Sequence, residues 1–397
     1  MSALLTGAGW LLTAAAGGPL AVFSTELLAG LWPAARRKRS PVSARIAILI
    51  PAHDEEAGIV DTVGALLEQV PPGARVIVIA DNCTDSTAAL AREAGAEVIE
   101  RNDPDARGKG YALAFGGDHL ALSGDSAPDV VLVVDADCRL LPGSIDTLAE
   151  AALRLGVPVQ ADYLFNADLV AAPMVQISNF AMLVKNRYRS RGMQRLGGAA
   201  LLTGTGMAFP WTLYAEADLA TGSIVEDLSF GVAMTRKGYP PKLIEEAEVR
   251  SAPAALGDTL AQRTRWEHGF LKTLCRDALP VLFGGLRRIS LPEILLGLHL
   301  AVPPLALLLV LAGAALALQV VLALLGGSAA ALATLAAITL FALTMVVAAW
   351  LGEGRAYLSG HALLRAPVYV LWKLPVYARF LRKPEASWNR TPRRPEG

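Results

Sequence analysis

The chain has 397 residues, enough for one large domain and a further part, and its 36 lysine and arginine residues balance 36 aspartate and glutamate residues. This balance does not predict nucleic acid or another polyanion as a partner. Hydrophobic residues make up 53% of the chain and charged residues 18%, and the apolar excess lies in residues 1–32 and 291–351. We therefore expect a water-soluble domain, residues 40–280, framed by membrane segments.

The first apolar stretch is predicted to be a transmembrane helix within residues 1–32. A signal peptide needs a basic region in front of its apolar part, and no Lys or Arg precedes Arg36. The basic run Arg36–Arg39 follows the stretch, so the positive-inside rule places the downstream domain in the cytoplasm and Glu26 near the inner interface. We thus expect an integral protein of a bacterial-type inner membrane.

Strands and helices alternate after the first membrane segment, which is typical of a doubly wound α/β domain. Buried strands are predicted where short apolar runs lie between turn signals. The predicted strands are Arg45–Pro51, Arg75–Ala80, Glu97–Glu100 and Val130–Val134. The predicted helices are Gly58–Val70, a helix capped by Thr84 that runs to Gly95, and one opened by Arg107–Gly110 that runs through Leu122.

Two carboxylates, Asp135 and Asp137, directly follow the strand Val130–Val134. Ligands of open α/β sheets bind beyond the carboxyl ends of the strands, so both side chains should border a site. Two hard oxygen donors there suit Mg²⁺ or Mn²⁺, which usually arrive with substrate phosphates. The alternative is that Asp137 only caps the following turn.

Other polar residues follow the neighbouring strands. Asp81 can accept hydrogen bonds from a nucleobase or a ribose, and Lys109, between two glycines, can reach a diphosphate. The sequence has neither Gly-x-Gly-x-x-Gly opening a helix nor a phosphate-binding loop of the Gly-x-x-x-x-Gly-Lys-Ser/Thr type. These residues predict a site for a nucleoside diphosphate with a divalent cation.

The second half of the domain carries further candidates. Met174–Leu196 is predicted to be an amphipathic helix with a basic, solvated face (Lys185, Arg187, Arg189 and Arg191), or one that contacts anionic lipid. Gly204, Thr205 and Gly206 form a turn that lets the backbone approach a ligand. Asp227, after Glu226 at a helix start, can act as a general base or merely cap the helix.

Gln262, Arg265 and Trp266 fall on one face of a helix, at spacings of three and four. Arg265 suits a phosphate, and Trp266 offers a plane against which an acceptor sugar can stack. The alternative is a buried tryptophan and an arginine that reaches from a helix at the membrane surface.

The C-terminal part predicts two transmembrane helices within residues 291–351, with Pro303–Pro304 interrupting the first and Gly326–Ser328 joining them. Residues 357–381 mix aromatic and basic side chains, which suits a helix that lies at the membrane interface. Residues 382–397 form a basic tail, expected in the cytoplasm.

Taken in order, these motifs resemble the membrane-bound family 2 glycosyltransferases, which include cellulose, chitin and hyaluronan synthases and ceramide glucosyltransferases. The resemblance covers residues 45–274, and its specific part is Glu226-Asp227 followed by Gln262-Arg263-Thr264-Arg265-Trp266. It implies a GT-A fold, a nucleotide-sugar donor, Mg²⁺ or Mn²⁺, and inversion at the transferred sugar.

The resemblance also implies roles for single residues. Asp227 is the catalytic base, and Asp135 and Asp137 hold the metal and the diphosphate. The nucleotide-binding residues are Pro51, His53, Glu55, Asp81, which binds the uridine, Lys109 and Asp135. The residues expected around acceptor and diphosphate are Gly204, Thr205, Gly206, Glu226, Gln262, Arg265 and Trp266.

The expected activity is transfer of a sugar, from a UDP-sugar, to a lipid-linked or polysaccharide acceptor in exopolysaccharide or glycolipid assembly. Membrane lipids and polysaccharide-assembly proteins are the further partners. The chain has few spans for a polymer channel, and Val225 precedes the acidic pair where many members have Thr. Addition of one sugar therefore fits better, and a processive synthase is the alternative. A sugar-1-phosphate nucleotidyltransferase would carry a glycine-rich basic loop in place of His53–Glu56, and a silent scaffold would not need the carboxylates.

Overall fold

The computed structural model describes residues 2–33, 43–122, 124–221, 225–252 and 256–382. The basic run Arg36–Arg39 and the tail beyond Arg382 lie outside these residues. The chain divides into two compact units, which we call the helical unit and the α/β unit. Among the described residues, the helical unit comprises 2–33, 167–198 and 267–382, and the α/β unit comprises the described parts of 43–166 and 199–266. The range 40–280 expected from composition is thus interrupted, because residues 167–198 group with the apolar helices.

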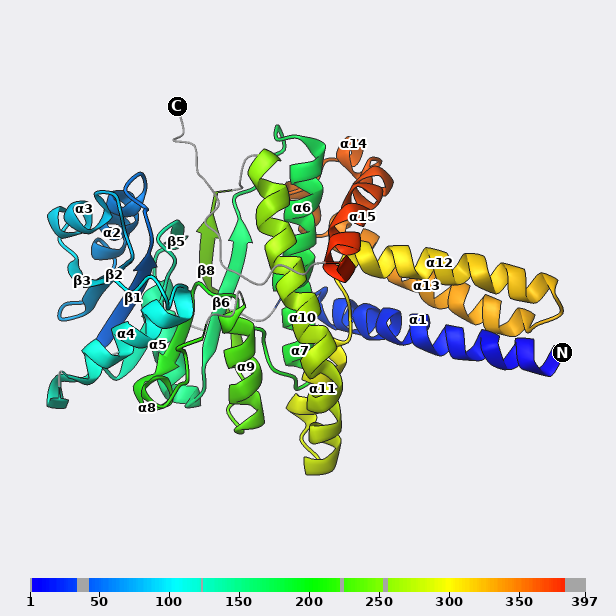
Figure 1. The fold of residues 1–397 in the computed structure, drawn as a ribbon, viewed down its shortest axis with the longest axis horizontal. Coiled ribbons are helices and arrows are strands. Elements are labelled where there is room, and N and C mark those ends of the chain that lie inside the picture. The colour runs from blue at the N-terminus through cyan, green and yellow to red at the C-terminus, as the bar shows by residue number, and fades with distance from the viewer. Residues whose placement is uncertain (1, 34–42, 123, 222–224, 253–255, 383–397) are drawn as a thin grey trace. The chain divides into compact units, whose positions relative to one another are not determined.

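The α/β unit is built on one eight-stranded sheet in the order β3-β2-β1-β4-β7-β6-β8-β5 (Figure 1). The four predicted strands are confirmed to within a residue at either end, and four further strands complete the sheet. The strands are β1 (Ile46–Ala52), β2 (Arg75–Asp81), β3 (Glu97–Arg101), β4 (Val130–Val133), β5 (Cys138–Leu140), β6 (Val159–Phe165), β7 (Met207–Pro210) and β8 (Lys242–Ser251).

The strand directions bring several strand ends to one edge of the sheet. β3, β2, β1 and β4 are parallel neighbours, whereas β7 runs antiparallel to both β4 and β6. β8 is parallel to β6. The carboxyl ends of β1, β2, β4, β6 and β8 therefore lie at the edge where β7 begins, and this edge is where α/β sheets bind ligands.

Helices cover both faces of this sheet, as the doubly wound pattern predicts. Alternate residues of β1 point to opposite sides: Ile48 joins one core cluster with Val63 of α2, and Leu49 joins the other with Leu113 of α4. The helices of this unit are α2 (Ile59–Leu67), α3 (Thr87–Glu93), α4 (Lys109–Ala121), α5 (Ser144–Leu155), α8 (Trp211–Ala215) and α9 (Glu226–Arg236).

The prediction that Thr84 caps the helix after β2 is wrong. The helix begins at Thr87, and the backbone N–H and the hydroxyl of Thr84 donate to the carboxylate of Asp54, the former over 2.6 Å. The N-cap residue is Ser86, and the Asp85 carboxylate accepts from the backbone N–H of Thr87, the first residue of the helix, over 2.9 Å. Asp54 thus links the loop after β1 to the loop after β2.

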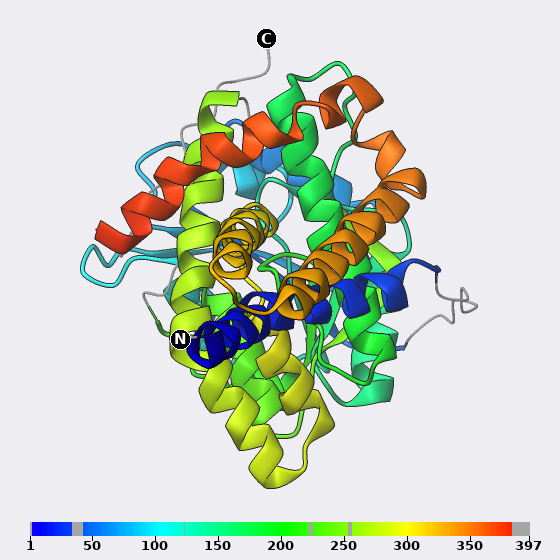
Figure 2. The same ribbon diagram turned by 90° about the vertical axis from the view of Figure 1, so that its right-hand side faces the viewer.

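Among the residues that the structure describes, the helical unit contains three helices that are long and apolar enough to cross a membrane: α1 (Ser2–Gly30), α12 (Leu305–Leu324) and α13 (Ala329–Leu351). They run side by side in both views (Figures 1 and 2). The remaining helices of this unit are α6 (Pro173–Leu183), a π-helical turn (Val184–Arg189), α7 (Ser190–Arg195), α11 (Leu291–Leu300), α14 (Gly360–Leu363) and α15 (Ala366–Arg382). α10 (Leu256–Arg288) begins in the α/β unit and continues into the helical unit.

Two contacts orient the apolar helices. The hydroxyl of Ser2 donates to the carbonyl oxygen of Gly326 over 3.1 Å, so α1 begins beside the loop between α12 and α13. At the other end, the Arg191 guanidinium donates to the carbonyl oxygen of Gly30 over 3.0 Å and lies 3.5 Å from the Glu353 carboxylate. The charged residues beside these helices thus gather at one end of the bundle.

The prediction that the basic face of Met174–Leu196 is solvated is wrong for Arg189 and Arg191, which are buried, whereas Lys185 and Arg187 are partly exposed. Arg189 and Arg191 are only 6% and 4% exposed. Arg189 Nε donates to Glu26 over 2.6 Å, and His299 Nδ1 lies 2.9 Å from the other Glu26 oxygen. Cationic side chains usually lie in water, whereas here Glu26 neutralises Arg189 inside the unit.

Candidate active site

The centre of the candidate site is formed where β4 ends and β7 begins. Val133 is paired with Met207, so the residues after β4 face those before β7. The backbone N–H of Asp135 donates to the hydroxyl of the fully buried Thr205 over 3.1 Å. The structure thus brings Asp135 together with the glycine-flanked turn, two motifs that are 70 residues apart in sequence.

Lys109 connects the same two segments from the start of α4. Its ammonium group donates to a carboxylate oxygen of Asp135 and, over 2.8 Å, to the carbonyl oxygen of Gly204. Burial alone would lower the pKa of Lys109, but the negative charge of Asp135 and its neighbours outweighs burial and raises the pKa above its usual value. Lys109 therefore carries a positive charge into the site at neutral pH.

The two glycines of the turn are needed for its shape. Gly204 and Gly206 have φ of +86° and +65°, a region that residues with a side chain rarely adopt. A Cβ atom on Gly204 would lie 3.1 Å from Nζ of Lys109 and 3.3 Å from Oδ2 of Asp227. Gly204 thus lets the lysine and the candidate base approach the same point of the backbone.

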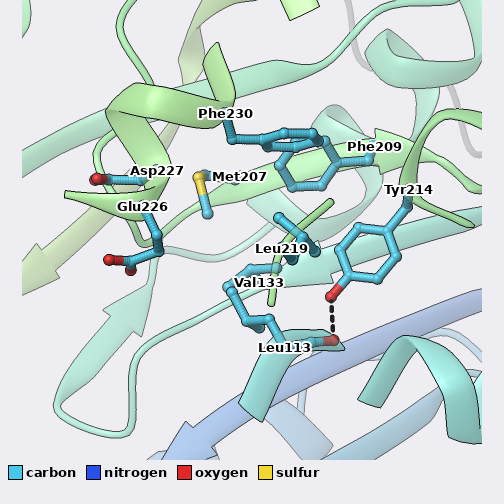
Figure 3. A pocket seen from close by; sticks show the side chains of 9 residues that line it. All are labelled: Leu113, Val133, Met207, Phe209, Tyr214, Leu219, Glu226, Asp227 and Phe230. Atoms are coloured by element: carbon cyan, nitrogen blue, oxygen red, sulfur yellow. Dashed lines mark hydrogen bonds between the residues drawn. The ribbon is translucent and has the colours of Figure 1, made fainter. Parts of the chain in front are cut away.

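Glu226 and Asp227 open α9 as predicted, and both lie at one end of a pocket (Figure 3). The rest of the pocket is apolar apart from the hydroxyl of Tyr214, which donates to the Leu113 carbonyl over 2.9 Å. The other lining residues are Val133, Met207, Phe209, Leu219 and Phe230. Burial, reinforced by the charge of Asp227, raises the pKa of Glu226 to about 8, although Lys109 opposes the shift.

The carboxylates at the end of β4 fit a divalent cation. One ligand atom each from Asp135, Asp137 and Cys138 lies within 4.8 Å of the others. Burial raises the pKa of the Cys138 thiol well above its usual range, so the thiol stays protonated and donates to Asp137 over 3.4 Å. The available donors are therefore carboxylate oxygens, which suit Mg²⁺ and Mn²⁺ rather than softer metals.

Four of the residues expected around the nucleotide lie at the ends of β1 and β2: Pro51, His53, Glu55 and Asp81. Pro51 is in β1 opposite Ile79 of β2, and His53 Nδ1 lies 2.7 Å from the backbone oxygen of Asp81. The backbone N–H of Glu55 donates to Thr87 over 2.7 Å. Thus Pro51, His53 and Asp81 come together as expected, and the main chain of Glu55 is tied to the start of α3.

The aromatic end of the site lies on α10, as predicted for Arg265 and Trp266; the side chain of Gln262 is outside the described residues. The Trp266 ring stacks on Phe165 at 6.4 Å, and the Arg263 guanidinium lies 5.0 Å from the Trp266 ring and 4.6 Å from Phe165. Phe165 ends β6, so the sheet edge positions Trp266.

Three residues at this edge were not singled out from the sequence: Arg101, Phe165 and Arg263. Arg101 ends β3, where it pairs with Asp81 over 2.7 Å. It directly follows a predicted strand, so the rule that strand ends carry ligand contacts could have found it. Phe165 carried no comparable signal, because β6 was not predicted, and Arg263 lies inside the motif Gln262–Trp266 but was given no role.

A family described as Glycosyltransferase like family 2 matches residues 44–269. The chain belongs to this family and is a glycosyltransferase. The GT-A fold expected from the motifs is confirmed, and the sheet and its helices correspond to those of family 2 transferases.

Relatives of known sequence match over shorter segments. The chain is 34% identical over 102 residues to Agl6, the hexosyltransferase of low-salt glycan biosynthesis in Haloferax volcanii. The matched segment covers 25% of this chain and 22% of Agl6. It is 30% identical over 103 residues to an uncharacterised glycosyltransferase of Mycobacterium tuberculosis, 26% of this chain and 41% of that protein. The matches thus span less than half of either relative.

Among solved structures, the chain resembles the mannosyltransferase PcManGT from Pyrobaculum calidifontis, determined with GDP-mannose and Mn²⁺. The TM-score is 0.52 at 20% sequence identity, over 93% of this chain and 99% of PcManGT. At this identity the likeness establishes a shared fold.

Proposed function

We propose that this glycosyltransferase moves a hexosyl group from a nucleotide-sugar donor to a lipid-linked or polysaccharide acceptor, with inversion at the transferred carbon. The observation that carries the proposal is the convergence of Asp135, Lys109 and Asp227 around Gly204. A metal-binding carboxylate, a cation and a candidate base then surround one point, as displacement of a diphosphate requires. The hexosyltransferase activity of Agl6 supports a hexosyl group as the unit transferred.

Asp135 and Asp137 would hold Mg²⁺ or Mn²⁺, as the Mn²⁺ in the PcManGT complex suggests. A cation bound there supplies positive charge to the donor diphosphate and stabilises it as it leaves. Lys109 pairs with Asp135 and lies where it can contact a phosphate oxygen. Arg265 is a second candidate for the diphosphate.

Asp227 acts as the general base. Its carboxylate takes the proton of the acceptor hydroxyl while that oxygen bonds to C1 of the donor sugar and the bond from C1 to the diphosphate breaks. Attack from the face opposite the diphosphate inverts the configuration. Glu226, with its raised pKa, is largely protonated at neutral pH, so it adds little negative charge beside the base.

We further propose that α1, α12 and α13 span the membrane and that the catalytic domain lies on its cytoplasmic face. The clustering of charged residues at one end of these helices supports a common inner end. α15 supports contact with lipid, because its polar residues Lys373 and Tyr377 are buried whereas Val368 and Leu371 are 56% and 64% exposed. A helix with its apolar face outward suits lipid at the membrane interface.

The test is a donor screen on the purified full-length protein in detergent with Mn²⁺. It follows release of nucleoside diphosphate from UDP- and GDP-sugars, with and without membrane lipid extract. We expect release from one donor, stimulated by lipid and abolished by a chelator. The proposal would be contradicted if no donor gave release and no nucleotide bound.

A further inference from the structure

The nucleobase end of the donor site contains an ion pair that the proposed mechanism does not use. Asp81 and Arg101 are directly opposite each other in the register of β2 and β3, the last residues of both strands. Arg101 Nη1 donates to Oδ1 of Asp81 over 2.7 Å, and the side chains are only 12% and 9% exposed, respectively. A second, distinct ion pair, Arg75–Glu97, joins the opposite ends of the same two strands.

The hydrogen bonds to Asp81 are unevenly shared between its two oxygens. Oδ1 also accepts from the side-chain amide of Asn82 over 3.0 Å. Among the residues that the structure describes, both hydrogen bonds to this carboxylate go to Oδ1. Oδ2 is therefore the one oxygen of Asp81 that can accept from a ligand.

The guanidinium that occupies Oδ1 is itself held from several sides. Arg101 donates to the carbonyl oxygen of Ala106 over 2.8 Å and to the carboxylate of Asp103 over 3.0 Å, and it lies 5.5 Å from the centre of the Tyr111 ring. These three contacts and the pairing with Asp81 hold the guanidinium group of Arg101 in place, so its hydrogen bond to Oδ1 should persist when a nucleotide binds.

We propose that Arg101 determines the base preference of the donor site: by occupying one oxygen of Asp81, it leaves a single acceptor beside a fixed cation, which selects uracil over guanine. This inference rests on the proposed function, because it assumes that a nucleotide donor binds at the ends of β1 and β2. It assigns a role to a residue that touches Asp81 and not the reacting atoms.

The reason is the hydrogen-bond pattern of the bases. Uracil presents one ring N–H between two carbonyl oxygens, so one acceptor oxygen next to a donor meets its needs. Guanine presents two adjacent donors, N1–H and the N2 amino group, and a carboxylate pairs with both only through both of its oxygens. With Oδ1 occupied, guanine would leave a donor without its partner, and an unpaired buried polar group weakens binding.

The experiment measures affinity for UDP, CDP and GDP by titration calorimetry on the full-length protein in detergent with Mn²⁺. We expect UDP to bind at least about tenfold more tightly than GDP. CDP should also bind at least about tenfold more weakly than UDP, because its N3 lacks a proton for Oδ2. Equal or tighter binding of GDP by the wild-type protein would overturn the inference without any variant.

The variants then test Arg101 itself. Arg101→Gln frees Oδ1 and should reduce the UDP-to-GDP affinity ratio by about fivefold or more. The matched control is Arg75→Gln, which removes the ion pair at the other end of β2 and β3 and should keep the wild-type ratio. An unchanged ratio in folded Arg101→Gln would refute the role of Arg101, as would an equal loss of preference in Arg75→Gln.

The outcomes also separate this inference from the proposed function. If GDP binds best, in a manner that depends on Asp137, the sugar-transfer proposal stands and the assignment of Arg101 fails. If no nucleotide binds, the proposed function fails as well. Should Arg101→Gln not fold, Arg101→Lys is the second variant, because it keeps the positive charge without the planar guanidinium group. It is also expected to lower the UDP-to-GDP affinity ratio.

Discussion

Charged side chains are withdrawn from water in both units, but with different results. In the α/β unit, Asp135 pairs with Lys109 and its side chain remains 32% exposed. In the helical unit, Glu26 pairs with Arg189 and His299 and is 2% exposed. Each oxygen of Glu26 has a protein partner, Oε2 from Arg189 and Oε1 from His299.

The difference distinguishes a possible ligand site from a structural ion cluster. Glu26 on α1, Arg189 before α7 and His299 on α11 connect three helices of one unit, so this cluster holds structure together. The close approach of α1 and α7 has a steric cause too, because a Cβ on Gly192 would lie 1.8 Å from the backbone oxygen of Glu26. Asp135 and Lys109, in contrast, are partly exposed and can exchange their pairing for a ligand.

The largest effect is expected from a change to the proposed base. Asp227→Asn should reduce turnover by about two to four orders of magnitude, because the amide cannot take the acceptor proton, while donor binding stays near the wild-type value. Initial rates of diphosphate release and the KM for the donor measure the two effects. Glu226→Gln is the matched control and should cost far less; near-normal transfer by Asp227→Asn would show that the base lies elsewhere.

For the cluster of Glu26, Arg189 and His299, we expect a substitution to reduce stability and not activity. Glu26→Gln leaves Arg189 without a counter-ion and should destabilise the protein by about 3–5 kcal/mol. Thermal unfolding of the detergent-solubilised protein should shift downward by roughly 10 °C. Glu353→Gln removes a carboxylate that is 39% exposed and should shift it much less. A Glu26→Gln protein with wild-type stability and reduced turnover would reverse the comparison.

Removal of a carboxylate that we propose to bind the metal should produce an intermediate effect. Asp137→Ala should raise the Mn²⁺ concentration needed for half-maximal donor binding by about 10- to 100-fold. Asp129, which precedes β4 and pairs with Arg45 over 2.8 Å, provides the control at the opposite end of the same strand. Asp129→Ala should leave the Mn²⁺ requirement unchanged, and an equal shift in both variants would argue against a cation at Asp137.

The smallest effect concerns pH. The folded-state pKa of Glu226 is raised to about 8, above its value in the unfolded chain, so folding favours the protonated form. Its contribution to stability is therefore complete below about pH 4.5 and is lost as the pH rises toward 8.

Glu226→Gln, which is neutral throughout, should gain stability relative to wild type across this range. The difference in unfolding midpoint should widen by a few degrees from pH 5 to pH 8. A difference that stays constant with pH would show that Glu226 is ionised throughout.

The strand-end motifs could be predicted because each depends on local pattern. An apolar run followed by Asp135 and Asp137 specifies a buried strand and a polar end, whatever the rest of the chain does. The same holds for the apolar stretches of α12 and α13, whose length and lack of charge already define possible membrane spans.

The partners of these residues could not be predicted in the same way. Lys109 with Gly204, Asp81 with Arg101 and Glu26 with Arg189 are separated by 95, 20 and 163 residues. The basic residues of Met174–Leu196 looked solvated because nothing nearby in sequence could neutralise them. Burial of a charge depends on its partner, and the partner is chosen by packing.

The sequence by itself determined the family, the parallel half of the sheet and the carboxylates at its edge, since these follow from hydrophobic period and motif order. Only the tertiary structure decided which carboxylates stay available to a ligand and which are saturated by protein. This difference depends on long-range contacts. An Asp or Glu can bind a ligand when its oxygens face an opening, and it stabilises the fold when cations from distant parts of the chain surround it.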